Sequence, residues 1–254
     1  MKKNQSHLPI FMQNPKTNEI LNEVIAVIPK GTRAYIVGGA ARNAVYYRIF
    51  GKAMPQRDYD LLLMGNMGQF VKNLRKLKFT CGLRRKNYMV LKKKKISKPK
   101  HHSDYIILDI HTPKEKNIIK NLKEEANFTV NCFAISLRDI TSKNWYKKLI
   151  YLPEAMVDLK AKRLHVNIVH KHPANLFACL RFMSKGFEAP SKEEVKTLLW
   201  ILGGLQKWRY KRNVKKIFDY VGGEKKARQL AKKLGIKADI FDFEIIKNLR
   251  NKKQ

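Results

Sequence analysis

Acidic residues are scarce in this sequence of 254 residues. There are 20 Asp and Glu against 54 Lys and Arg, so the formal net charge at pH 7 is +34. A surface with this much positive charge repels itself unless a polyanion neutralises it. The charge balance therefore predicts a nucleic acid as the partner, with an anionic membrane surface as the alternative.

Long apolar runs are also missing. No segment approaches the ~18 consecutive apolar residues of a membrane-spanning helix. Residues 1–16, MKKNQSHLPIFMQNPK, lack the continuous apolar core of a secretory signal. We therefore expect no membrane association, and of the two polyanions the sequence favours the nucleic acid.

Cysteine is rare as well. Cys81, Cys132 and Cys179 are far apart and form no CxxC pair, and the histidines show no spacing to them that is typical of a zinc site. We expect three ordinary thiols. This usage fits the cytoplasm or another reducing compartment inside a cell, an organelle included.

The apolar patterning predicts an α+β protein with two parts. Short strands are expected at 34–37 and 59–64, and two more within 87–111, with helices between them. From about residue 143 the strand pattern fades, and helical periodicity continues to the end. The expected parts are an N-terminal arm over 1–17, a head with a small mixed β-sheet over 18–142, and an all-helical neck and short body over 143–254.

The stretch AYIVGGAARNAVYYRIFGKAMPQRDYDLLL, residues 34–63, places two carboxylates near a glycine pair. Side chains alternate along a strand, so Asp58 and Asp60 are expected on the same face. Two like charges this close are unfavourable without a cation between them, and Mg²⁺ is the natural occupant. Two Mg²⁺ ions would suit phosphoryl or nucleotidyl transfer.

The glycine pair predicts the other half of such a site. Gly38 and Gly39 precede an expected helix, whose free backbone N–H groups attract an anion, and Arg42 adds a fixed cation in the first turn. The pattern GGAARN is neither the dinucleotide motif GxGxxG nor a phosphate-binding loop ending in GK[ST]. Each motif alone is more often structural, and only the combination indicates a triphosphate site facing a metal site.

The combination resembles the signature of class II nucleotidyltransferases, the family of bacterial-type poly(A) polymerases and CCA-adding tRNA enzymes. The matching residues are Gly38, Gly39, Arg42, Arg57, Asp58 and Asp60. The segment YIILDIHT resembles the family strand that supplies a third carboxylate, here Asp109. The segments ANFTVNCFAIS and HPANLFACLRFMSKGF resemble two later family motifs, so the resemblance covers about residues 18–190.

The resemblance implies roles for these residues. Asp58, Asp60 and Asp109 would be the catalytic carboxylates and would hold two Mg²⁺ ions. The substrate would be ATP or another NTP. By the same resemblance, the nucleotide-binding residues are Gly38, Gly39, Arg42, Arg57, Asn131, His172, Asn175 and Arg181.

Several positions depart from the family pattern. Asn43 stands where an aspartate is usual, and Glu125 and Ala126 replace a pair of arginines. In CCA-adding enzymes an acidic residue and an arginine of the neck hydrogen-bond the incoming base, and these positions are His172 and Asn175 here. Because their donors and acceptors differ, we expect no ordered CCA addition and favour ATP as the substrate.

Basic residues crowd one C-terminal segment, LQKWRYKRNVKKIFDYV at 205–221. The expected apolar face of this helix consists of Leu205, Trp208, Ile217, Phe218 and Val221. The rest of its surface carries Lys207, Arg209, Lys211, Arg212, Lys215 and Lys216. An ordinary amphipathic helix explains the apolar face but does not require so many cations, so we expect an RNA-backbone track here.

The sequence thus predicts an enzyme that adds nucleotides, AMP from ATP above all, to RNA 3′ ends without a template, as a poly(A) polymerase does. One alternative is a non-catalytic, basic RNA-binding subunit or assembly factor on the same scaffold. The three retained carboxylates argue against it, since a scaffold has no use for that charge cluster. A second alternative is a tRNA nucleotidyltransferase that adds CCA or a single nucleotide. A protein partner that supplies RNA specificity is left open.

Overall fold

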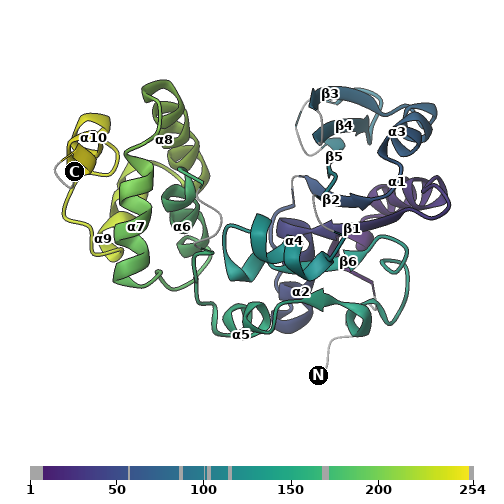
Figure 1. Ribbon diagram of the computed structural model, residues 1–254, viewed down its shortest axis with the longest axis horizontal. Helices are drawn as coiled ribbons and strands as arrows, with labels where there is room; N and C mark the ends of the chain where they lie inside the picture. The colour runs from purple at the N-terminus through teal and green to yellow at the C-terminus, as the bar shows by residue number, and fades with distance from the viewer. Residues whose placement is uncertain are drawn as a thin grey trace. The chain divides into compact units, whose positions relative to one another are not determined.

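The computed structural model describes residues 8–56, 58–85, 88–99, 101, 104–113, 116–167 and 172–251. The chain divides into two compact units, Met1–Lys123 with Asn131–Ala155 and Glu124–Val130 with Met156–Gln254. The first unit contains the β-sheet and the second is mainly helical (Figure 1). The α+β class predicted from the sequence is confirmed.

The first unit is built on a seven-stranded sheet with the order β3-β4-β5-β2-β1-β6-β7, which can be followed in Figure 1 for the labelled strands. The strands are β1 (Arg33–Val37), β2 (Tyr59–Met64), β3 (Thr80–Arg85), β4 (Tyr88–Lys94), β5 (Tyr105–His111), β6 (Phe133–Ser136) and β7 (Ile150–Tyr151). Only β2 and β5 pair in parallel among these neighbours. The central strands bury Ile36, Leu61 and Leu108 completely, so the middle of the sheet is the core of this unit.

Helices and short 3-10 turns are interspersed with these strands along the chain. The helices are α1 (Pro15–Ala26), α2 (Gly38–Phe50), α3 (Met67–Lys76) and α4 (Ile118–Glu125), with 3-10 turns η1 (Ile10–Gln13), η3 (Thr129–Asn131) and η4 (Trp145–Lys148). Helix α2 packs against β1, β2 and β6. It follows β1 without an intervening loop, so its first residues are set by the strand that precedes them.

The expected N-terminal arm needs correction, because residues 10–17 are folded. Phe11 and Met12 of η1 are buried, and the Phe11 ring lies 5.5 Å from that of Tyr59, centroid to centroid. Asn14 then caps α1, where its side-chain oxygen accepts a hydrogen bond from the backbone N–H of Thr17 at 2.9 Å. Apolar burial together with a capped helix start fixes this segment on the first unit.

Two strands were not expected from the sequence. β3 contains Gly82 and lacks a clean alternation, and β7 has only two residues and lies in the part predicted to be all-helical. Each is held by an antiparallel neighbour, β4 for β3 and β6 for β7. Strand formation at such sites depends on pairing more than on the residues' own propensity.

The second unit is a set of packed helices. They are α5 (Pro153–Ala161), α6 (Asn175–Met183), α7 (Lys192–Leu202), α8 (Lys207–Val221), α9 (Glu224–Lys233) and α10 (Phe243–Asn251). Helix α6 packs against α7, α8 and α9, and α10 packs against α7 and α8. No helix in the described part of the chain is long and apolar enough to cross a membrane.

Candidate active site

Two of the three expected carboxylates lie side by side in the sheet. The parallel pair β2 and β5 sets Asp60 opposite Asp109 in the register, and neighbouring strands are about 4.8 Å apart. Asp58 directly precedes β2 and lies two residues before Asp60, so the alternation along the chain returns it to the same face. The fold thus brings Asp58, Asp60 and Asp109 to one edge of the central strands.

The electrostatics of Asp60 reflect this grouping. Its pKa is raised to about 7, first by burial and then by the negative charges of Asp58 and Asp109, while Arg42 acts to lower it. This raised pKa means that too little solvation and positive charge surround the ionised form of the carboxyl group to stabilise it. A bound cation would supply that stabilisation.

The residues fit Mg²⁺ by the chemistry of their donors. Among the described residues, no group of three or more His, Cys, Asp and Glu is already gathered as a metal site. The fit therefore rests on three carboxylates that interact through their charges, because carboxylate oxygens are the protein ligands that Mg²⁺ prefers. Asp58, Asp60 and Asp109 are the residues that would hold the metal.

Tyr88 is a neighbour of this cluster that the sequence did not indicate. Its hydroxyl donates a hydrogen bond to Oδ2 of Asp109 at 3.3 Å. The pKa of Tyr88 is raised to about 12, first by burial and then by the charge and hydrogen bond of Asp109. The tyrosine is therefore a stable donor at neutral pH, and it orients the Asp109 carboxylate.

The glycine pair forms the start of α2 itself. Gly38, expected in a turn before the helix, is its first residue and has a φ of 61°. A Cβ atom at Gly38 would lie 3.0 Å from Oδ2 of Asp60, because Val37 is the register partner of Asp60 on β1. No side chain caps the start of α2, so its first backbone N–H groups are available to an anion next to Asp60.

Arg42 is held within the first turns of α2. Its side chain is only 7% exposed. Nη1 donates to Oδ1 of Asn131 at 2.5 Å, and Nε and Nη2 donate to Oδ1 of Asn43 at 3.2 and 2.9 Å. The fold thus joins two of the predicted nucleotide-binding residues, Arg42 and Asn131, and keeps the guanidinium charge near Asp60.

Asn43, where the family has aspartate, links Arg42 to the loop before Asp58. Its Nδ2 donates to Oε1 of Gln56 at 2.9 Å and to the carbonyl of Pro55 at 3.3 Å. The Gln56 amide in turn donates to the backbone carbonyl of Asp58. Asparagine can accept from Arg42 and donate to this loop at once, whereas an ionised aspartate can only accept. Gln56 was not identified from the sequence, and Arg57 lies outside the described residues.

The predicted nucleotide-binding residues of the neck lie in the second unit. His172 is exposed and Asn175 is the first residue of α6, where the Asn175 N–H donates to the His172 carbonyl at 3.0 Å. The Asn175 side chain is 1% exposed. Arg181 lies in the last turn of α6, with its guanidinium 5.9 Å from the centroid of the Tyr220 ring. His172 and Asn175 are thus neighbours, and Arg181 lies more than a turn further along the helix.

The six cations predicted to contact RNA all lie on α8 and are all exposed. Trp208, expected on the apolar face, is 56% exposed instead. It lies nine residues before the buried Ile217, and nine residues make about 2.5 turns of helix, which places the two side chains on opposite faces. The guanidinium groups of Arg209 and Arg212 lie 5.1 and 5.2 Å from the Trp208 ring centroid.

No protein-family model and no curated protein matches the sequence. Solved structures do match. A Thermotoga maritima CCA-adding enzyme complexed with tRNA is 20% identical with a TM-score of 0.62, over 87% of this chain and 51% of that one. A tRNA-processing enzyme is 23% identical with a TM-score of 0.59, over 87% and 57%. A tRNA nucleotidyltransferase complexed with a primer tRNA and an incoming ATP analogue is 22% identical with a TM-score of 0.58, over 83% and 58%.

This chain therefore spans between half and three-fifths of the length of these relatives. At such identities the likeness establishes the fold. The chain has the fold of the CCA-adding enzymes and tRNA nucleotidyltransferases, which confirms the resemblance seen in its motifs.

Proposed function

We propose that this protein transfers a nucleoside monophosphate from an NTP to the 3′-hydroxyl of an RNA and releases pyrophosphate. The observation that carries the proposal is the register of Asp60 with Asp109 across β2 and β5, next to the uncapped start of α2. Carboxylates beside an anion-binding helix start suit a reaction at a triphosphate. Solved proteins of this fold are described as complexes with tRNA, CTP or ATP.

In this proposal, residues of the first unit hold the metal ions and the triphosphate. Asp58, Asp60 and Asp109 would hold two Mg²⁺ ions, which when bound neutralise phosphate charge and lower the pKa of the attacking hydroxyl. Gly38 leaves space beside Asp60 and presents the N–H groups of α2 to the triphosphate. Arg42 supplies a positive charge whose position is set by Asn43 and Asn131.

Two further residues act through the carboxylates. Tyr88 holds one oxygen of Asp109, and the Gln56 amide holds the backbone of Asp58. We propose that both are positioning residues, since electrostatic catalysis depends on groups that are oriented before the substrate arrives.

We further propose AMP from ATP as the preferred transfer, without an ordered CCA programme. The support is the neck, where His172 and Asn175 offer different donors and acceptors from the acidic and arginine pair of the CCA-adding family. The second candidate is addition to tRNA ends, which is favoured by fold relatives described as complexes with tRNA. Products on a tRNA that lacks its CCA end, sequenced after reaction with all four NTPs, separate the two.

The test of the proposal is extension of a labelled RNA by the purified protein with Mg²⁺ and each NTP in turn. We expect extension by the native protein and none by the double variant Asp58→Asn with Asp60→Asn, which should still bind RNA. Asp219→Asn, at an exposed position of α8, is the control for loss of a carboxylate and should extend normally. Extension by the double variant would refute the carboxylate assignment. No extension with any NTP would favour the non-catalytic RNA-binding alternative.

A further inference from the structure

The second unit contains an aromatic pocket that the proposed reaction does not use. It has a volume of about 260 Å³ and lies between α8 and the residues that lead into α10. Four rings line it, those of Tyr210, Phe218, Phe241 and Phe243. Val214 lies among them, one turn of α8 after Tyr210 and one turn before Phe218.

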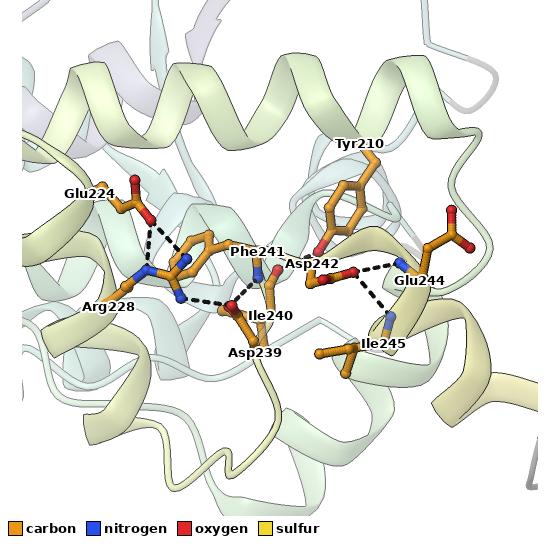
Figure 2. Close-up of polar contacts among 9 residues, drawn as sticks. All are labelled: Tyr210, Glu224, Arg228, Asp239, Ile240, Phe241, Asp242, Glu244 and Ile245. Atoms are coloured by element: carbon orange, nitrogen blue, oxygen red, sulfur yellow. Dashed lines mark hydrogen bonds and ion pairs between the residues drawn. The ribbon is translucent and has the colours of Figure 1, made fainter.

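The segment that carries two of these rings is fixed by polar contacts, which Figure 2 shows. Nη1 of Arg228 contacts Oδ2 of Asp239 at 2.8 Å, and its Nε donates to Oε1 of Glu224 at 2.7 Å. Oδ1 of Asp239 accepts the backbone N–H of Phe241 at 3.0 Å. These contacts tie the segment before α10 to α9 and set the position of the Phe241 ring.

The same segment is fixed from its other end. The hydroxyl of Tyr210 donates to the carbonyl of Ile240, which joins the segment to α8 (Figure 2). Oδ1 of Asp242 accepts the backbone N–H groups of Glu244 and Ile245 at 2.8 and 3.3 Å at the start of α10. The pocket walls are therefore held in place before a ligand arrives, which lowers the entropic cost of binding.

The four rings contact one another in two pairs. The Phe241 centroid lies 5.1 Å from that of Phe218, and the Phe243 centroid lies 5.3 Å from that of Tyr210. The ring planes within these pairs are inclined by 52° and 71°, so the pocket presents both ring faces and ring edges to a flat ring system, which gains by stacking and edge contacts. A ligand with a flat, partly apolar ring fits them better than a flexible chain.

Two cations line the same pocket. Lys211 and Lys215 are exposed and lie one helical turn apart on α8. An apolar protein segment would gain nothing from these charges, whereas a ring attached to an anionic backbone would gain from both parts of the site. The net charge of +34 further favours an anionic ligand.

We propose that this pocket binds one unpaired base of a single-stranded RNA, with the adjoining phosphates on Lys211 and Lys215. The inference rests on the proposed function, in which RNA is the substrate, and it adds an RNA contact in the second unit to the reaction site proposed in the first. Binding by stacking is tolerant of sequence, because every base has a π face. The pocket would hold the RNA during addition without selecting a sequence.

The test compares two fluorescent probes by anisotropy, without NTP or Mg²⁺: a ten-nucleotide oligo(A) RNA and an abasic strand of the same length. The native protein should bind oligo(A) on the order of tenfold more tightly than the abasic strand, the size expected for one stacked base. Val214→Trp fills the pocket and should remove this advantage while leaving the abasic affinity unchanged. Val157→Trp, at a position 59% exposed on α5, is the matched control and should keep it.

A second variant guards against a folding defect in Val214→Trp. Phe243→Leu keeps apolar volume but removes one ring, and it should lower the oligo(A) advantage severalfold. The double variant Lys211→Gln with Lys215→Gln should lower the affinity for both probes by a similar factor. This loss should exceed that of the control double variant Lys225→Gln with Lys226→Gln, at exposed positions of α9.

The outcomes separate this inference from the proposed function. Equal affinity of the native protein for both probes would overturn the base pocket, even if RNA extension succeeds. If both pocket variants still bound oligo(A) more tightly than the abasic strand by the native factor, the stacked base would lie elsewhere. That result would also overturn the base pocket. Failure of extension, with the base-dependent binding present, would count against the proposed reaction alone.

Discussion

At the scale of single residues, the candidate site depends on how closely β2 approaches the start of α2. Gly38 is the contact point, since its backbone lies against the Asp60 carboxylate. Its φ of 61° lies in the left-handed region, which a side chain disfavours. Steric space and backbone conformation therefore both select glycine here.

Gly38→Ala should abolish or strongly reduce RNA extension, because the new Cβ would push the Asp60 carboxylate away. The measurement is the initial rate of extension alongside RNA affinity, which should stay unchanged. Gly51→Ala is the matched control, since Gly51 has a φ of 65° but no atom within 4 Å of an added Cβ. Both variants should lose about 1 kcal/mol of stability from backbone strain, and only the first should lose activity. Equal rates in the two variants would contradict the role of this contact.

The raised pKa of Asp60 predicts a pH-dependent stability in metal-free buffer. An unfolded aspartate has a pKa near 3.9, whereas Asp60 has a pKa of about 7 in the folded protein. Between these values the folded state binds more protons than the unfolded state, so the free energy of unfolding falls as pH rises and levels off above pH 7. Each unit of difference between the folded and unfolded pKa corresponds to about 1.4 kcal/mol in the free energy of unfolding.

Asp60→Asn removes this charge and should raise the melting temperature relative to the native protein at pH 8 but not at pH 4. Thermal unfolding followed by circular dichroism in EDTA measures both. Mg²⁺ added at pH 8 should stabilise the native protein more than the variant, since the cation relieves the repulsion among the carboxylates. A variant with the same pH dependence as the native protein would show that Asp60 is ordinarily solvated.

At the scale of elements, α8 shows how one helix serves two purposes. Tyr210, Ile217 and Val221 are buried and form its inner face, while the six exposed cations share the remaining surface with Trp208 and Asp219. Asp219 is the only acidic residue of the helix. This division lets α8 support the second unit and still present exposed positive charges, of which Lys207 is paired with Oε1 of Glu244 at 2.7 Å.

Replacing Lys207, Arg209, Lys211, Arg212, Lys215 and Lys216 with Gln should weaken RNA binding and flatten its salt dependence. For single-stranded RNA, the logarithm of the binding constant falls with the logarithm of the salt concentration, with a slope of about −0.7 for each phosphate neutralised. Each phosphate contact that is lost therefore makes this slope less steep. Affinity for the NTP should be nearly unchanged, because none of these six residues is among the proposed nucleotide-binding residues. Anisotropy titrations over a series of salt concentrations provide the measurement.

The control replaces four exposed lysines of α9, Lys225, Lys226, Lys232 and Lys233, with Gln. It lowers the net charge without touching α8 and should change the slope less. Normal RNA binding by the α8 variant would mean that this helix is only a solvated face. The lysine loop at 92–100, of which residue 100 lies outside the described residues, would then be the better candidate.

At the scale of the whole molecule, the excess of positive charge should limit stability in the absence of a ligand. A net charge of +34 creates repulsion that salt screens and a polyanion cancels. We therefore expect the melting temperature to rise when NaCl is increased from about 20 to 300 mM, where the Debye length is shorter.

Heparin at low salt should raise the melting temperature further, because it binds the folded surface. Uncharged dextran of similar size is the control and should have little effect. A melting temperature that does not respond to salt or heparin would indicate that the positive charges are already balanced within the fold.

The sequence by itself determined the features that depend on neighbours along the chain. The strand at 59–64 was placed correctly, since alternation and adjacent polar residues mark such an element locally. The pairing of carboxylates with a glycine pair and the positive charge of α8 were equally visible, because they need only spacing and composition. The family resemblance extended this reading to Asp109.

Only the tertiary structure decided how distant segments meet. It sets Asp60 opposite Asp109 and brings Tyr88 to the Asp109 carboxylate, contacts that depend on strand order and register. It also exposes Trp208, which the apolar pattern alone predicts to be buried. The aromatic pocket joins α8 to residues about 30 positions later. Such contacts depend on which surfaces pack against each other in the folded chain, and a local sequence pattern does not determine that packing.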